Sequence, residues 1–253
     1  MAKVVHVHLM VGKHEGRKDF YFSSISAIYT VLTAEEIGAT KNYLLHAGLG
    51  GNGTENDLTQ STKDAKSLAS LYKLKGATVV LLTSKNATRS NIIAAIRKVK
   101  GIATSSDHII FSYSGHGIEN RICTYASSPK NMLSYADLFR ELDQCAVKNI
   151  VCYIDACFSG TAVSSLRSNS RYIVFLSSRS SETSSESQLV GSGLLTNGIA
   201  KGLRGKADSD GDKNVTVMEL FKYIHKDVQV HNKKQHPQLV TPKSLYNNVL
   251  MSW

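Results

Sequence analysis

Short hydrophobic runs recur along the chain and indicate the strands of a buried sheet. The runs cover residues 4–11, 43–47, 78–82, 108–114, 150–154 and 172–176. The last four are apolar along their length instead of alternating between apolar and polar positions. This is typical of strands that are covered on both faces. The runs therefore predict a mostly parallel sheet of about six or more strands.

Segments with helical spacing lie between these runs. In residues 64–72 the side chains of Ala65, Leu68 and Tyr72 fall on one helix face. Ser134 is expected to begin a helix, with Asp137 three residues later as its capping-box partner. The helices expected after the first cover residues 90–99, 134–146, 194–203 and 217–226. Alternation of strands and helices predicts a three-layer α/β/α fold with right-handed crossovers.

Two polar segments interrupt this alternation. Residues 48–62 are rich in Gly, Asn and Thr, and residues 177–193 are dominated by serine. We expect both to be loops, and long loops in such folds tend to be binding or activation segments. No change of composition marks a domain boundary, so residues 1–253 are expected to form a single domain. Within it, residues 1–40 form an N-terminal extension to which the pattern assigns no structure.

The composition is that of an ordinary globular domain. Hydrophobic residues make up 42% of the chain and prolines number 3, which argues against disorder and low-complexity structure. No apolar run approaches the length of about 18 residues that a membrane span requires. The N-terminal apolar stretch is short and contains His6 and His8, so we expect no signal peptide and a cytoplasmic protein.

The chain is basic, with 30 Lys and Arg against 20 Asp and Glu and a net charge of +10. Such a balance raises the possibility of nucleic-acid binding. The cations, however, are scattered over the ends and outer faces of the predicted helices, and no aromatic residues are interleaved with them. A solvated surface is therefore the favoured interpretation, and nucleic-acid binding is kept as a third option for function.

The four cysteines do not form a metal or disulfide pattern. Cys123, Cys145, Cys152 and Cys157 are separated by 22, 7 and 5 positions, and no CxxC pair occurs, so a zinc site is not expected. Without a secretory signal, disulfides are not expected either. We interpret the first three as small core residues. Cys157 differs from them because it comes just after the end of the predicted strand over residues 150–154.

Unusual residues follow two of the predicted strands. The run 108–114 is followed by Gly115, His116 and Gly117, and the run 150–154 leads into Cys157. His116 and Cys157 are 41 residues apart with one predicted helix between them, which leaves room for one crossover between parallel neighbours. Adjacent strands lie about 4.8 Å apart. We therefore expect His116 and Cys157 to meet at the carboxyl edge of the sheet, where open α/β sheets bind ligands.

A histidine beside a cysteine is suited to nucleophilic catalysis. The thiolate is the attacking species, and an imidazole takes the proton of the thiol or lowers its pKa. The amides of Gly117 and Cys157 are then placed to form an oxyanion hole. The alternative interpretation is a buried cysteine and a surface histidine that follow two strands without acting together.

These residues carry a resemblance to a known family. Residues 113–117 (YSGHG) and 155–160 (DACFSG) resemble the two catalytic motifs of the caspase-like cysteine peptidases, in particular the metacaspases and their bacterial relatives. Residues 58–65 (LTQSTKDA) resemble another segment of the family, although Lys63 replaces its asparagine. The resemblance covers residues 41–240 and implies a caspase-like fold.

The resemblance also implies an activity. His116 and Cys157 would form the catalytic dyad of a cysteine endopeptidase, with His116 as general base and later proton donor. Metacaspases cleave after Arg or Lys, and their specificity residues correspond to Asp64, Ser114 and Asp155. Two carboxylates in a pocket favour a cation and repel an acidic side chain. We therefore expect protein or peptide substrates with basic residues.

Other interpretations of these acidic residues remain open. Asp155 can be a strand-end carboxylate satisfied by backbone amides, and Asp64 can be a residue favoured near a helix N-terminus. The same dyad with specificity for Asp, or a catalytically silent interaction module with this fold, are the alternative functions. Basic specificity would also permit self-cleavage, because Arg167, Arg171 and Arg179 lie in or beside predicted loops.

A second motif resembles a calcium-binding loop. Carboxylates occupy positions 1, 3, 5 and 12 of a twelve-residue segment, namely Asp208, Asp210, Asp212 and Glu219. Lys213, however, replaces the glycine needed at position 6, and Thr216 with Glu219 also fits a capping box that begins a helix. No cofactor is required for the dyad chemistry. Metacaspases often require calcium, so calcium is expected as a possible activator, at this loop or elsewhere.

Overall fold

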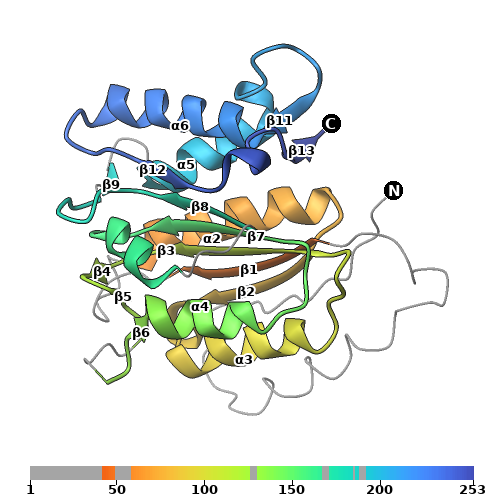
Figure 1. The fold of residues 1–253 in the computed structure, drawn as a ribbon. Coiled ribbons are helices and arrows are strands. Elements are labelled where there is room, and N and C mark those ends of the chain that lie inside the picture. Colours follow the sequence, from red (N-terminus) through yellow and green to blue (C-terminus); the bar gives the residue numbers. More distant parts are fainter. Residues whose placement is uncertain (1–41, 49–57, 126–129, 167–170, 185, 188–191) are drawn as a thin grey trace.

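The computed structural model of the chain describes residues 42–48, 58–125, 130–166, 171–184, 186–187 and 192–253 (Figure 1). The strand predicted over residues 4–11 and the N-terminal extension lie outside these residues. Among the described helices, none is both long enough and apolar enough to cross a membrane.

Six strands form the central sheet, in the order β12-β8-β7-β3-β1-β2. Their bounds are β1 (Asn42–Gly48), β2 (Thr78–Thr83), β3 (His108–Ser114), β7 (Asn149–Asp155), β8 (Tyr172–Leu176) and β12 (Gln238–Val240). All neighbours pair in parallel except β12, which is antiparallel to β8. Five of these strands confirm the prediction. The edge strand β12 was not predicted because it has only three residues, all of them partly exposed.

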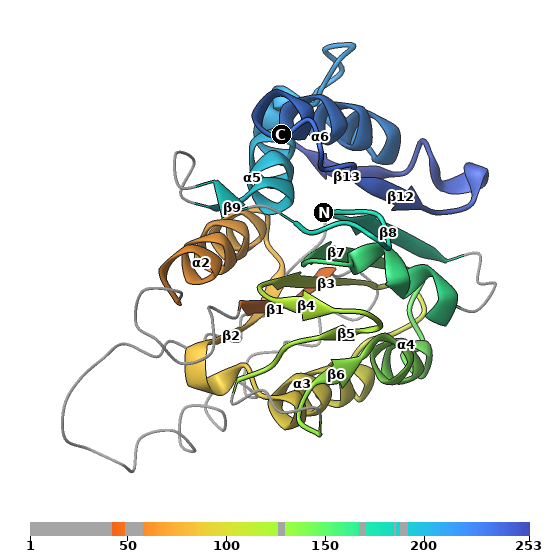
Figure 2. The same cartoon turned by 90° about the vertical axis from the view of Figure 1, so that its left-hand side faces the viewer.

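Helices cover both faces of this sheet (Figures 1 and 2). Their bounds are α2 (Leu58–Leu74), α3 (Arg89–Lys100), α4 (Tyr135–Asp143), α5 (Leu194–Lys201) and α6 (Val217–His231). Helices α3 and α4 lie on one face and α2, α5 and α6 on the other, which confirms the three-layer α/β/α arrangement. Helix α2 begins at Leu58, so residues 58–62 are helical where a loop was expected. Their polar composition concealed the start of an amphipathic helix.

Short elements complete the chain. They are η3 (Ser84–Asn86), β4 (Gly117–Ile118), β5 (Arg121–Ile122), β6 (Leu133–Ser134), η4 (Ser159–Ser165), β9 (Glu186–Ser187), β10 (Ser192–Gly193), η5 (Gly202–Lys206), β11 (Asn214–Thr216), η6 (Lys243–Leu245) and β13 (Val249–Ser252). Strands β4, β5 and β6 form a small sheet at the edge where β3 and β7 end (Figure 1). Strands β11 and β13 pair near the opposite edge.

Alternate residues of β2, β3, β7 and β8 enter two separate hydrophobic clusters. In β3, Phe111 packs on the side of α3 and α4, whereas Ile110 packs on the side of α2, α5 and α6. In β7, Cys152 and Tyr153 divide in the same way. Because side chains alternate between the faces of a strand, the two faces bury separate apolar surfaces.

Side chains accept hydrogen bonds at the start of two helices, but of the two predicted capping boxes only the one at Thr216 is complete. The Ser134 hydroxyl accepts a hydrogen bond from the Asp137 amide at 3.1 Å, and the Asp137 carboxylate forms ion pairs with Arg89 and Arg140. Thr216 and Glu219 form a complete capping box at the start of α6. Local polar signals therefore determine where these helices begin.

Candidate active site

The two motif-bearing strands end side by side in the sheet. Strands β3 and β7 are parallel neighbours whose register pairs Ser114 with Asp155. The Gly115 amide continues the pairing, because it donates a hydrogen bond to the Asp155 carbonyl at 3.0 Å. The chain thus leaves both strands at the same edge of the sheet, at the left in Figure 1.

His116 comes directly after Gly115 and has an exposed side chain. Its carbonyl accepts hydrogen bonds from the Tyr113 hydroxyl at 2.7 Å and the Cys123 amide at 3.0 Å. A Cβ at Gly117 would lie 2.6 Å from the Cys157 carbonyl oxygen, so only glycine fits there. Gly115 and Gly117 both contact the chain at residues 155–157, and His116 lies between them. The fold therefore brings the backbones of His116 and Cys157 together.

Cys157 lies in the turn between β7 and the short helix η4. The next residue, Phe158, has a left-handed backbone with φ of 56°, a conformation that costs a non-glycine residue about 1–2 kcal/mol. Its amide donates a hydrogen bond to the Glu182 carbonyl at 2.8 Å, and its own carbonyl accepts one from the Thr161 amide. These bonds hold the strained turn on which Cys157 is presented. Backbone strain of this kind is concentrated at functional sites.

The exposure of Cys157 distinguishes it from the other cysteines. Cys157 is partly exposed, whereas Cys123, Cys145 and Cys152 are buried. Burial raises the pKa of Cys145 to about 11 and the pKa of Cys152 further still. Because a thiol reacts as the thiolate, Cys145 and Cys152 are inert at neutral pH.

Ser184 covers the Cys157 sulfur in this conformation. The Cys157 thiol donates a hydrogen bond to the Ser184 carbonyl, with Sγ and O 3.5 Å apart. The Ser184 amide in turn lies 3.3 Å from the same Sγ and donates to it. One residue of the serine-rich segment therefore contacts the sulfur through both of its backbone polar groups.

The Asp155 carboxylate is buried and fully engaged. It is 5% exposed and accepts hydrogen bonds from the Thr196 amide at 2.8 Å, the Thr196 hydroxyl at 3.0 Å and the Ser184 hydroxyl at 2.9 Å. Burial raises its pKa, although these hydrogen bonds oppose the rise. Thr196 lies in the first turn of α5, whose N-cap residue, Gly193, has no side chain. Asp155 thus supplies a cap for α5 from another part of the chain.

The other expected specificity residues lie on the same side of the sheet. Ser114 is the register partner of Asp155 and is 2% exposed. Asp64 lies in α2, the helix that packs on this face. The side chain of Asp64 falls outside the described part of the structure. The structure thus places the two strand-end residues together and assigns Asp64 to the adjoining helix.

Side chains that the sequence did not single out fix the segment around Ser184. The Gln235 side chain is fully buried and donates to the Ser177 carbonyl at 2.9 Å and to the Ser184 hydroxyl at 3.4 Å. Glu182 accepts hydrogen bonds from the backbone amide and ring Nδ1 of His236, at 3.1 and 2.8 Å. No sequence signal marks these contacts, because serine is abundant in this segment and Gln235 lies in a polar stretch.

The acidic loop lies apart from His116 and Cys157, before α6. The carboxylate oxygens of Asp208, Asp210 and Asp212 lie within 4.8 Å of one another. Lys213 has a left-handed backbone with φ of 66°, so it adopts the conformation for which calcium loops use glycine. Glu219, by contrast, accepts hydrogen bonds from Ser209 on one carboxylate oxygen and from Thr216 on the other. Burial opposes a low pKa, but these bonds lower the pKa of Glu219 to about 2.

Comparison with known proteins agrees with this architecture. The family model described as the caspase domain matches residues 40–246. The crystal structure of protein GSU0716 from Geobacter sulfurreducens is similar, with a TM-score of 0.60 and 16% sequence identity, covering 84% of this chain and 98% of that one. At that identity the likeness concerns the fold alone. A search of curated proteins gives no significant match. Because the family model spans most of the chain, the resemblance is confirmed at this level: the chain belongs to the caspase-domain family of cysteine peptidases.

Proposed function

We propose that this chain is an endopeptidase that cleaves proteins after Arg or Lys, with Cys157 as nucleophile and His116 as general base. The observation that carries the proposal is the register of β3 and β7, which pairs Ser114 with Asp155. This pairing brings the two segments that follow the strands together at one sheet edge. Cys157 is also the one cysteine among the described residues that is not buried.

The reaction proceeds in two displacement steps. His116 takes the proton from the Cys157 thiol, and the thiolate attacks the substrate carbonyl carbon to form a C–S bond. The tetrahedral intermediate then expels the amine, which leaves with the proton from His116. In the second step His116 takes a proton from water, and the resulting hydroxide attacks the thioester. This releases the acid and restores the thiol.

The backbone near Cys157 is suited to stabilise the intermediate. Within the described part of the chain, no hydrogen bond engages the Cys157 amide, so this donor is available to an oxyanion. Gly117 packs against the Cys157 carbonyl, so the backbone of Gly117 lies next to the backbone of Cys157. Preorganised amides of this kind stabilise developing negative charge.

Release of Ser184 would open both parts of the site. Its backbone covers the Cys157 sulfur, and its hydroxyl occupies the oxygen of Asp155 that Thr196 does not use. When this segment moves, a substrate guanidinium or ammonium group can replace the Ser184 hydroxyl on Asp155. The buried carboxylate favours such an exchange, because its ordinary hydroxyl partner carries no charge.

A second candidate function rests on the same contact. If Ser184 never leaves the Cys157 sulfur, the domain is a catalytically silent interaction module. A third candidate is the same dyad with specificity for Asp, and this specificity would require a cationic pocket. The residues around Asp155 that form its hydrogen bonds are Thr196 and Ser184, and neither supplies a positive charge.

Self-processing is part of the proposal, and accessibility narrows the candidate positions. The Arg171 guanidinium is partly buried and donates to the carbonyls of Cys145 and Asp143. The Arg179 side chain is exposed and pairs with Glu182 at 3.5 Å. Arg167 lies outside the described residues. Of Arg171 and Arg179, Arg179 is therefore the accessible one.

Calcium has no place in the chemical steps. Asp208, Asp210 and Asp212 would hold the ion through their clustered carboxylates, and the ion would supply charge neutralisation in the loop before α6. Glu219 would have to leave Thr216 and Ser209 to join them. A calcium requirement therefore stays a prediction.

Fluorogenic peptides that differ only in Arg, Lys or Asp before the cleaved bond test the proposal. We expect cleavage of the Arg and Lys peptides, and a loss of about a thousandfold or more in Cys157→Ala and His116→Ala. His231→Ala, an exposed histidine at the end of α6, is the matched control. Equal activity in wild type and Cys157→Ala would refute the proposal that the chain is a cysteine peptidase. Cleavage after Asp alone would eliminate the pocket assignment but leave the dyad.

A further inference from the structure

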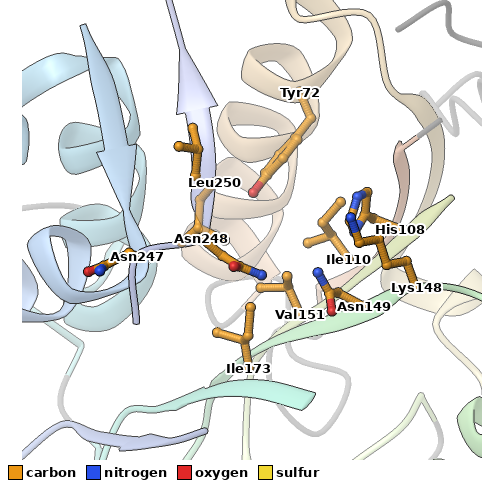
Figure 3. Close-up of a pocket in the computed structure, with 11 residues that line it drawn as sticks. Tyr72, His108, Ile110, Lys148, Asn149, Val151, Ile173, Asn247, Asn248 and Leu250 are labelled. Atoms are coloured by element: carbon orange, nitrogen blue, oxygen red, sulfur yellow. The ribbon is translucent and has the colours of Figure 1, made fainter. Parts of the chain in front are cut away.

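A cavity lies at the edge of the sheet opposite the proposed dyad. It has a volume of about 420 Å³, within the range of small-molecule sites. His108 and Asn149, the first residues of β3 and β7, line it together with the C-terminal segment around Asn248 and Leu250 (Figure 3). From His108 to Ser114 strand β3 extends for about 20 Å. The cavity is therefore separate from the proposed active site.

Apart from the Tyr72 hydroxyl, the polar side chains that line this cavity have no partner among the described residues. They are the side chains of His108, Lys148, Asn149, Asn247 and Asn248. None of them forms a hydrogen bond or ion pair with another described residue. Asn149 is only 7% exposed as a residue, but its side-chain amide is not among the fully enclosed polar atoms, so the amide opens onto the cavity. In Figure 3 the amide groups of Asn149 and Asn248 face one another across the cavity.

The charge of the lining is positive. Lys148 is its cation, and no Asp or Glu is among the described residues that line the cavity. His108 lies beside Lys148 (Figure 3), and burial together with this neighbouring cation lowers its pKa. The Asp107 carboxylate acts on the pKa of His108 in the opposite direction, but it is 2% exposed and accepts hydrogen bonds from the Thr104 amide and hydroxyl. Lys148 therefore gives the described lining of the cavity a net positive charge.

The floor of the cavity is apolar. Ile110, Val151 and Ile173 contribute side chains from three neighbouring strands, and Leu250 closes one side. The Tyr72 hydroxyl is satisfied by the Tyr153 hydroxyl at 2.9 Å. An apolar floor beneath a cation and unpaired amides matches a molecule with an apolar body and one negatively charged group.

We infer that this cavity binds a small organic anion, whose carboxylate or phosphate group contacts Lys148, Asn149 and Asn248 while its apolar part rests on the sheet. The anion supplies acceptors for the Lys148 ammonium and the two amide groups at once. Binding here does not depend on the proposed peptidase activity, because the cavity contains no residue of the dyad or its pocket.

Isothermal titration calorimetry of the whole chain tests this inference. The probes are phenyl phosphate and benzoate, with benzyl alcohol as the uncharged analogue. We expect saturable binding at one site by at least one anion, and binding of the alcohol at least about tenfold weaker. Lys148→Met should weaken anion binding about tenfold, because it removes a charged hydrogen-bond donor. Lys148→Arg should retain it.

Two control variants separate this site from the rest of the surface. Lys226→Met removes an exposed lysine of α6 and should leave binding unchanged. Cys157→Ala should also bind the anion normally, which distinguishes the cavity from the proposed active site. Absence of saturable binding by both anions, or equal binding by wild type and Lys148→Met, would overturn the inference. Loss of binding on alkylation of Cys157 would overturn it too, since the anion would then occupy the dyad.

Discussion

Substitution of Ser184 by alanine should expose the Cys157 sulfur. In the structure the Ser184 amide and carbonyl contact Sγ, and the Ser184 hydroxyl donates to Asp155 at 2.9 Å. Ser184→Ala removes this bond and the longer one, at 3.4 Å, that the Gln235 side chain donates to the same hydroxyl. The backbone contacts with sulfur remain and are weak, so the hydroxyl bond to the carboxylate is the stronger restraint on this segment.

The size of the effect follows from the strength of that bond. A hydrogen bond to a charged group contributes about 1.5–3 kcal/mol, which corresponds to about 10- to 150-fold in an equilibrium constant. Once the segment has moved, Asp155 meets water in both proteins, so the substitution acts on the closed state. We therefore expect the open population of Ser184→Ala to rise about tenfold or more.

The rate of Cys157 alkylation by iodoacetamide, followed by intact mass spectrometry, measures this population. Cys123, Cys145 and Cys152 are 6%, 1% and 0% exposed, so one adduct should form in the folded protein. Cys157→Ala provides the blank. Thr183→Ala, which removes an exposed hydroxyl from the preceding residue, is the matched control and should alkylate at the wild-type rate. An unchanged or slower rate in Ser184→Ala would refute the proposed restraint.

Three further substitutions test other parts of the structure. Asp155→Ala leaves the Thr196 amide and hydroxyl without their acceptor, and we expect it to lower the free energy of unfolding in urea by about 2–4 kcal/mol; no change would contradict the capping role of Asp155. Gly193→Ala places a methyl group against the Asp155 carboxylate and should lower the melting temperature. Gly211→Ala is its control: a methyl group there meets no neighbour, but the backbone of Gly211 has a φ of 80°, so this variant measures the cost of backbone strain alone. Glu219→Gln should cost about 1 kcal/mol at pH 7. The pKa of Glu219 is lowered from 4.5 to about 2 in the folded state, so its stabilisation is complete above about pH 4.5 and is lost as the pH falls toward 2. The difference between wild type and Glu219→Gln should therefore vanish near pH 2, and a constant difference across that range would argue against the capping box.

The sequence by itself determined the layers of the fold and the sheet edge where His116 and Cys157 lie. Hydrophobic runs and helical spacing are local signals, so five of the six central strands were predicted close to their observed positions, and the five described α-helices were predicted with less exact ends. Helix α2 begins six residues before the predicted start, and α6 ends five residues after the predicted end. The motifs around His116 and Cys157 follow β3 and β7 directly, and parallel neighbours must end at the same edge. Local polar signals were equally reliable at Thr216 and Glu219, where the capping box forms.

Only the tertiary structure decided what surrounds these residues. Ser184 reaches Cys157 across 27 positions of the chain, and Thr196 reaches Asp155 across 41. These contacts use backbone groups of small polar residues that follow no periodic pattern, so nothing in the order of residues selects one serine or threonine over another. The cavity beside Lys148 has the same origin, because it combines the first residues of two strands with the C-terminal segment. Folding of the chain brings distant polar groups together and leaves others without partners. It therefore determines both the covering of Cys157 by Ser184 and the polar lining of the cavity beside Lys148.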